Sequence, residues 1–196
     1  MDFSSEAPLE RGLDANLLVY SLLEGHPAAA VCEQFILGRT GWFTTSLTLL
    51  EAKTVLVKVY DVPPPLATRK LRQMAAGPLP VTPIDRAVVE AAMHSADAQG
   101  LDLFDAVLLE SCRQLGVKRL ASADRKLALA CRKAGIQAEN PMDRRLRGQM
   151  ATWEAAHLPS KGLPRLLREV HRWLSLSHPE AAGDFWSHTG MGSRLP

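Results

Sequence analysis

The chain has 196 residues, a hydrophobic fraction of 46% and a formal net charge of +2 at pH 7. This length and composition are typical of a globular protein with a sizeable core, and they favour one domain with an appendage over two full domains. The net charge is too small to identify a nucleic-acid-binding protein. It is unevenly distributed, since residues 141–196 carry eight Lys or Arg against five Asp or Glu, whereas residues 1–140 carry fifteen against sixteen.

In chain order, Leu13 opens an apolar run that continues into residues 17–19, and residues 27–37 have helical spacing. Residues 42–44 are aromatic and β-branched, which favours a second strand. Ser46 is the expected cap of the next helix, although residues 54–59 also fit the alternation of a strand. The prolines at 63–65 end this element and start a helix that runs to Ala76.

The second half of the chain continues the alternation. The pattern predicts strands over residues 79–82, 117–121 and 136–138, with helices capped by Asp85, ended by Gly116, and running from Asp124 to Gly135. Alternating strands and helices predict a parallel sheet between two layers of helices. In such sheets, ligands bind outside the carboxyl ends of the strands.

Four carboxylates fall near those ends: Asp14, Glu51, Asp105 and Asp124. If the sheet is parallel, all four lie at the same edge. Carboxylates packed that closely disfavour one another's ionisation unless a cation joins them. Oxygen ligands suit a hard divalent ion such as Mg²⁺ or Mn²⁺, which activates water and neutralises a phosphoryl oxygen.

Each carboxylate also has a structural interpretation. Asp14, Asp105 and Asp124 are suitable residues for a turn or a helix cap, and Glu51 is suitable for a solvated helix surface. Asp102, one turn before Asp105, is either a further member of the acidic group or an exposed loop residue.

Four segments carry these carboxylates in order: residues 12–20 (GLDANLLVY), 46–51 (SLTLLE), 103–109 (LFDAVLL) and 120–127 (LASADRKL). The set resembles the four motifs of PIN domains, over about residues 13–138. No single motif is specific, but four in the right order and spacing are. The sequence departs from some family members because Arg125, Lys126 and Leu127 stand where those proteins have a further acidic residue.

The resemblance implies a three-layer α/β/α sandwich around a parallel sheet. It also implies Mg²⁺- or Mn²⁺-dependent hydrolysis of RNA phosphodiester bonds, leaving a 5′-phosphate. Many small bacterial members are VapC-type toxins held by a partner antitoxin, and this chain is a candidate toxin with RNA and an antitoxin as partners. By the same resemblance, the metal-binding and catalytic residues are Asp14, Glu51, Asp105 and Asp124, with Asn16 and Ser122 as supporting polar groups.

Small PIN toxins usually end near the last strand, so we divide the chain into a PIN-like domain, residues 1–140, and a mildly basic helical extension, residues 141–196. One face of a predicted helix in the extension is apolar: Leu163, Leu166, Leu167, Val170, Trp173 and Leu174. Arg165, Arg168 and Arg172 lie opposite, as an ordinary solvated face, an RNA-binding stripe or part of a homodimer contact. Poor order is expected beyond Pro179.

Two rival functions remain. A PIN-like module that binds RNA or protein without cutting would be expected to have lost one or more of the carboxylates. Another phosphate-handling enzyme would show a Gly-rich phosphate loop or an Asp-x-Asp motif at the first strand, and neither is present.

The three cysteines form no CxxC pair, the N-terminus is acidic, and no segment approaches the roughly 20 apolar residues of a membrane span. We therefore expect a cytoplasmic protein that does not span a membrane.

Overall fold

The sheet is parallel throughout. The structure, a computed structural model, describes residues 8–77, 79–158 and 163–189. Within them lies a five-stranded sheet in the order β3-β2-β1-β4-β5. Its strands are β1 (Arg11–Leu13), β2 (Trp42–Thr45), β3 (Val81–Thr82), β4 (Arg119–Ala121) and β5 (Gln137–Glu139). All four pairings are parallel, as predicted.

The strand order reverses direction at β1, the central strand. From β1 the chain builds β2 and β3 on one side, then returns to the other side to build β4 and β5. Gly12 pairs with Phe43 of β2 and with Leu120 of β4. In α/β sheets, ligands bind outside the carboxyl ends of the two strands that flank such a reversal, here β1 and β4.

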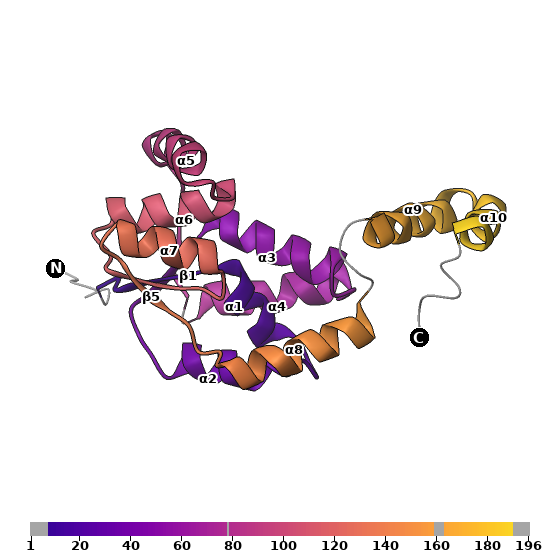
Figure 1. Ribbon diagram of the computed structural model, residues 1–196, viewed down its shortest axis with the longest axis horizontal. Helices are drawn as coiled ribbons and strands as arrows, with labels where there is room; N and C mark the ends of the chain where they lie inside the picture. The colour runs from indigo at the N-terminus through magenta and orange to yellow at the C-terminus, as the bar shows by residue number, and fades with distance from the viewer. Residues whose placement is uncertain (1–7, 78, 159–162, 190–196) are drawn as a thin grey trace.

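Helices cover both faces of the sheet (Figure 1). They are α1 (Ala15–Leu22), α2 (Ala29–Leu37), α3 (Ser46–Lys58), α4 (Pro64–Ala76), α5 (Arg86–Gln99), α6 (Leu103–Gln114), α7 (Arg125–Lys133), α8 (Arg144–His157), α9 (Leu163–Ser177) and α10 (Pro179–Thr189). One buried cluster joins α1, α2, α3, α4 and α8, and a second joins α5, α6 and α7. The predicted α/β/α sandwich is therefore confirmed, together with additional C-terminal helices. No helix among the described residues has the length and apolarity to cross a bilayer.

The first apolar run is two elements instead of one. Strand β1 ends at Leu13, and α1 begins at Ala15, so residues 17–19 are helical. Leu17 and Leu18 are completely buried. A short helix that is apolar on nearly every side has no clear periodicity, which is why the sequence did not separate it from the strand.

The second motif lies on a helix along its whole length. Residues 54–58 belong to α3, so the alternative strand interpretation is wrong there. Burial of Thr48, Ala52 and Leu56, each four residues apart, shows the helical period. The cap is Thr45 instead of Ser46, because the Thr45 hydroxyl accepts a hydrogen bond from the Thr48 amide at 3.1 Å.

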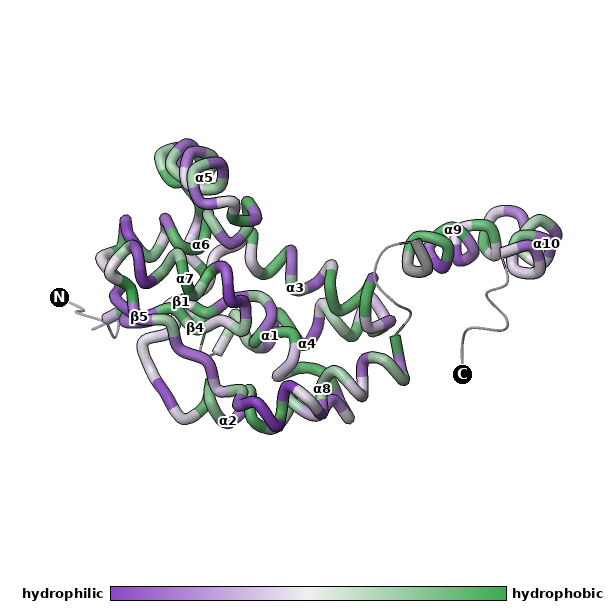
Figure 2. The backbone as a smooth tube through the Cα atoms, in the orientation of Figure 1, coloured by the Kyte–Doolittle hydropathy of each residue, from purple (hydrophilic) through white to green (hydrophobic). Residues whose placement is uncertain are grey.

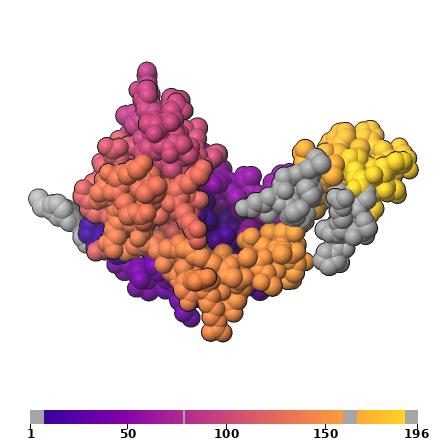
Figure 3. Space-filling model, in the orientation of Figure 1, coloured from indigo at the N-terminus to yellow at the C-terminus, as the bar shows by residue number. Residues whose placement is uncertain are grey.

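The extension begins with a helix that packs on the main body. Met142 and Met150 are buried in the same cluster as α1 and α2, although both lie beyond the expected boundary at residue 140. The space-filling view shows a hollow between α7 and α8, with indigo surface of the first elements at its floor (Figure 3). Helix α8 is therefore part of the packed body.

Aromatic side chains attach α8 to residues of α1 and to those that follow α1 and α3. The ring of Trp153 meets the buried His26 ring edge-on, with centroids 4.9 Å apart, and His26 stacks on Tyr20 at 4.9 Å. Tyr60 donates a hydrogen bond to Glu154 at 3.0 Å. Burial lowers the pKa of His26. The contacts join residues that are far apart in the sequence.

Helices α9 and α10 lie to one side of the body, near the end of α3 (Figure 1). Hydrophobic and hydrophilic residues alternate along α9, as predicted for an amphipathic helix (Figure 2). Residues 179–189 form α10, which packs on α9. The expectation of poor order beyond Pro179 stays a prediction, and residues 190–196 lie outside the described residues. His171 and Trp186 bring the two helices together, with ring centroids 4.5 Å apart.

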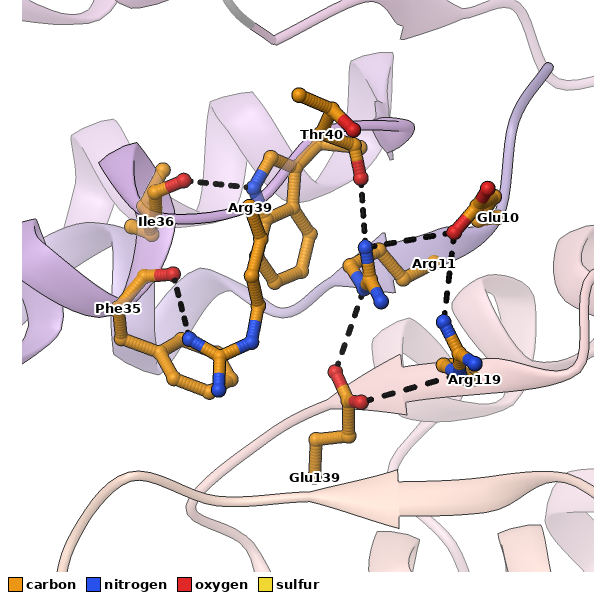
Figure 4. Close-up of polar contacts among 9 residues, drawn as sticks. Glu10, Arg11, Phe35, Ile36, Arg39, Thr40, Arg119 and Glu139 are labelled. Atoms are coloured by element: carbon orange, nitrogen blue, oxygen red, sulfur yellow. Dashed lines mark hydrogen bonds and ion pairs between the residues drawn. The ribbon is translucent and has the colours of Figure 1, made fainter.

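At the start of β1, charged side chains neutralise one another (Figure 4). Arg11 is buried, and its guanidinium donates to the Thr40 carbonyl at 2.7 Å and faces Glu139 at 3.5 Å. Arg119 pairs with Glu10 at 3.3 Å and lies 4.0 Å from Glu139. Two arginines and two glutamates therefore form a closed network at this place.

Replacing Trp153 with Ala tests the attachment of α8. We expect the free energy of unfolding to fall by about 2–3 kcal/mol, because a large ring in contact with His26 is lost. The measurement is urea denaturation followed by circular dichroism. Trp173→Ala is the matched control, since this ring is 57% exposed, and it should change stability by less than about 0.5 kcal/mol. Equal effects would contradict the packing of α8 on the body.

Candidate active site

Asp14 lies at the centre of the acidic group. It follows β1 directly, is only 4% exposed, and is tied to β4 through its own amide, which donates to the Ala121 carbonyl at 3.0 Å. Although Asp14 occupies the cap position of α1, its side chain makes no capping hydrogen bond. Its Oδ2 instead accepts hydrogen bonds from Ser122 Oγ at 2.6 Å and from Asn16 Nδ2. The cap interpretation therefore does not explain this side chain.

Asn16 and Ser122 form a small polar network around Asp14. Asn16 Nδ2 also donates to Ser122 Oγ at 3.2 Å, and Asn16 Oδ1 accepts from the Ala123 amide at 3.0 Å. Ser122 Oγ accepts from the Asp124 amide at 2.9 Å. The two residues join the ends of β1 and β4 and hold one carboxylate oxygen in a fixed direction. Their supporting role in function stays a prediction.

Asp124 is the cap of α7. Its Oδ1 accepts hydrogen bonds from the amides of Lys126 at 2.6 Å and Leu127 at 2.9 Å. The structural interpretation of this residue is therefore correct, but it leaves Oδ2 without a hydrogen bond among the described residues. One oxygen can stabilise the helix while the other faces a ligand.

Glu51 and Asp105 reach the site from opposite layers. Glu51 lies in the second turn of α3, and Asp105 lies in the first turn of α6. Both are half-buried. The cap of α6 is Asp102, whose side chain accepts a hydrogen bond from the Phe104 amide at 2.9 Å. Asp105 is therefore not the cap of this helix. Asp102 is exposed, yet its charge acts on both Glu51 and Asp105.

Burial and mutual repulsion raise the pKa values of three of these groups. Burial, partly offset by the Ser122 hydrogen bond, raises the pKa of Asp14 to about 6. Burial and the charge of Asp14 raise the pKa of Glu51 to about 7. Burial, followed by the charges of Asp14, Asp124 and Glu51, raises the pKa of Asp105 to about 8. A helix N-terminus normally favours an acidic residue, so burial and repulsion outweigh that effect at Asp105.

The group has negative charge without a protein cation to balance it. Among the ion pairs of the described residues, none involves Asp14, Glu51, Asp105 or Asp124. An all-oxygen donor set with excess charge fits Mg²⁺ or Mn²⁺ better than a softer metal. In residues 8–77, 79–158 and 163–189, no three His, Cys, Asp or Glu side chains are already arranged as the ligands of one ion. The metal-binding roles of the four carboxylates therefore stay predictions.

The arginines of the extension have intramolecular partners. Arg168 pairs with Asp61 at 2.9 Å, and Arg172 pairs with Asp61 and with Glu169. The side chain of Arg165 lies outside the described residues. Because Asp61 and Glu169 balance two of the guanidinium charges, the predicted RNA-binding stripe has less free charge than the sequence indicated. Its role stays a prediction.

The fold is a doubly wound α/β domain, and its acidic residues lie beyond the ends of β1 and β4, where the strand order reverses. The sequence matches the family model of the PIN domain over residues 13–133. The match spans more than half of the chain, so the chain belongs to the PIN domain family, as the four motifs indicated. A comparison with curated proteins gives no match.

Similar solved structures share this fold. VapC20 of Mycobacterium tuberculosis, described as a toxin that cleaves the sarcin–ricin loop, is 14% identical with a TM-score of 0.55, covering 62% of this chain and 95% of that one. A protein from Pyrobaculum aerophilum is 22% identical with a TM-score of 0.52, covering 74% and 98%. A toxin–antitoxin complex from Klebsiella pneumoniae is 19% identical with a TM-score of 0.50, covering 68% and 99%.

The raised pKa values predict how stability depends on pH in the absence of metal. Folded Asp105 holds its proton to about pH 8, whereas the ordinary pKa of an aspartate is 3.8. Its contribution to stability is therefore present below about pH 4 and is lost as pH rises through 8. In EDTA at pH 8, Asp105→Asn should be more stable than the wild type by at least about 1 kcal/mol in urea denaturation. At pH 4 the difference should vanish.

The matched control is Asp97→Asn, which removes an exposed carboxylate on α5. It should leave the free energy of unfolding unchanged at both pH values. If Asp105→Asn is instead destabilised at pH 8 in EDTA, the carboxylate serves a structural purpose and the repulsion argument is wrong.

Proposed function

We propose that this PIN domain is a Mg²⁺- or Mn²⁺-dependent endoribonuclease that hydrolyses RNA phosphodiester bonds. One observation supports the proposal: Asp14 and Asp124 follow the neighbouring strands β1 and β4, and the charges of Asp14, Asp124 and Glu51, together with burial, raise the pKa of Asp105 to about 8. These charges act on one another although they come from the residue after β1, from α3, from α6 and from the start of α7. PIN-family nucleases generally use a divalent ion, and an ion bound here would neutralise this charge and activate a water molecule.

The chain's own groups take different parts in this proposal. Asp14 is the most rigid ligand, because Asn16 and Ser122 fix the direction of its carboxylate. Asp124 contributes the oxygen that α7 does not use. Glu51, which reaches the site from α3, is the candidate base that takes a proton from the attacking water.

We also propose that this protein is the toxin of a toxin–antitoxin pair. The similar structures include a sarcin–ricin-loop-cleaving toxin and a toxin–antitoxin complex, which supports RNA as substrate and an antitoxin as partner. The apolar side chains of Leu166, Trp173 and Leu176 on α9 are 59%, 57% and 84% exposed. Exposed apolar surface of this kind favours contact with another protein, an antitoxin or a second copy of the chain.

The alternative is a PIN-like module that binds RNA or protein without cutting it. The retention of all four carboxylates argues against this alternative, because a module that only binds does not need four repelling charges in one crevice. Metal dependence of cleavage distinguishes the two functions.

Cleavage of a quenched fluorescent RNA is the test. We expect activity in Mg²⁺ or Mn²⁺ and none in EDTA. Asp14→Asn and Asp105→Asn should each lower the rate at least about 100-fold, because a metal ligand is lost, and Ser122→Ala should lower it by about 10- to 100-fold through the orientation of Asp14. Circular dichroism should show each variant folded.

Asp97→Asn is again the control and should cut like the wild type, since its carboxylate is exposed on α5. Metal-independent cleavage, or full activity of Asp14→Asn, would overturn the proposed site. Binding of RNA without cleavage in either metal would support the non-cutting module.

A further inference from the structure

Helix α7 is an exposed cationic element. Its sequence, RKLALACRK, has four basic residues and no acidic one. Arg125, Lys126, Arg132 and Lys133 are all exposed. None of them takes part in the ion pairs of the described residues, in contrast to Arg11 and Arg119 in Figure 4 and to the arginines of α9.

The first turn of α7 is an unfavourable place for these charges. The N-terminus of a helix carries partial positive charge, which favours acidic residues and disfavours Arg125 and Lys126. The last turn favours cations, so Arg132 and Lys133 have a structural explanation by themselves. Arg125 and Lys126 do not, and they directly follow the acidic residue Asp124.

A groove runs along one face of α7. Lys126, Leu129, Ala130 and Lys133 recur at the spacing of a single helix face, and together with Gln99 and Gly100 they line a groove of about 280 Å³. Leu129 is 48% exposed between the two lysines. The groove therefore combines a cation at each end with an apolar surface in the middle.

The dimensions of this face fit a nucleic-acid backbone. Lys133 lies seven positions after Lys126, which is about 10 Å along the helix axis. This length exceeds the rise of about 3.4 Å per nucleotide along the axis of a stacked strand, so the two lysines can contact different phosphates of one strand. Leu129 offers a surface against which a ribose or a base can lie.

We propose that the α7 groove, with Lys126 and Lys133 at its ends, binds the phosphate backbone of the RNA strand next to the bond that is cut. The proposal rests on the proposed nuclease function. It places the substrate path on α7 instead of on the arginines of α9, Arg165, Arg168 and Arg172, which are called the α9 stripe below. Carboxylates alone repel a polyanion, and a cationic helix that begins directly after Asp124 supplies the attraction needed to bring the polyanion to the site. Because the groove binds the backbone through charge, it selects polyanions and does not distinguish one base sequence from another.

The test is the affinity of the full-length protein for a fluorescein-labelled single-stranded RNA, measured by anisotropy in EDTA so that metal-dependent cleavage does not interfere. The variant is Lys126→Gln/Lys133→Gln. We expect its Kd to rise by about tenfold or more at low salt. The slope of log affinity against log salt should fall by about 1.4, since about 0.7 is lost per phosphate contact with a single strand.

The matched control is Lys118→Gln. Lys118 is also exposed and outside the described ion pairs, but it precedes β4 at the opposite edge of the sheet from Asp124. Its replacement should leave Kd and the salt slope unchanged. Thermal melting of all variants should match the wild type, because only surface side chains change.

A Kd for Lys126→Gln/Lys133→Gln equal to that of Lys118→Gln would overturn the inference, whether or not the wild type cuts RNA. Arg168→Gln/Arg172→Gln with a larger loss of affinity would overturn it too, in favour of the α9 stripe. Wild-type cleavage of the same RNA in Mn²⁺ is measured separately. If the wild type does not cut this RNA but the α7 variant alone loses affinity for it, the RNA-binding role of the groove is supported and only the nuclease function is contradicted.

Discussion

The hydrogen bond from Ser122 to Asp14 joins the two strand ends on which the acidic site depends. It connects β1 and β4 at the point where the sheet reverses its order, and it lies in a buried position. Because Ser122 also accepts from the Asp124 amide, one hydroxyl fixes both a buried carboxylate and the start of α7. Glu51 and Asp105 then approach from the two helical layers. The topology of the parallel sheet therefore determines the site, because it makes β1 and β4 neighbours and brings the segments that follow them together.

Charge is divided sharply over the molecule. Carboxylates that repel one another lie beyond the ends of β1 and β4, while α7 presents cations that take part in no ion pair among the described residues. Elsewhere the charges are paired, as in the network around Arg11 and in the contacts of Arg168 and Arg172 with Asp61. A nearly neutral net charge thus conceals an acidic centre beside a basic helix. The overall value of +2 gives no indication of this arrangement.

Features set by local rules could be read from the sequence. The carboxyl ends of parallel strands meet at one edge of a sheet. The sequence therefore predicted that Asp14 and Asp124 lie at the same edge. Features set by distant contacts could not. Helix α8 has few apolar residues of its own, and its position depends on His26 and Tyr20, which are more than a hundred residues away. The charge of Arg172 was visible as part of a stripe, but its partner Asp61 is 111 residues distant. Thr45 and Ser46 are adjacent hydroxyl residues, and only the hydrogen bond to Thr48 decides between them.

The sequence distance across the acidic site affects how the protein folds. Asp14 and Ser122 are 108 residues apart, and Asn16 and Ala123 are 107 apart. Loops of that length close late and slow the folding of sheets with non-local pairing. We therefore expect the crevice to be among the last parts of the body to assemble, after local elements such as the α5–α6 pair. A chain that stalls or misfolds before β4 docks would have no organised carboxylate cluster, so any chemistry of this site would appear only once folding is complete.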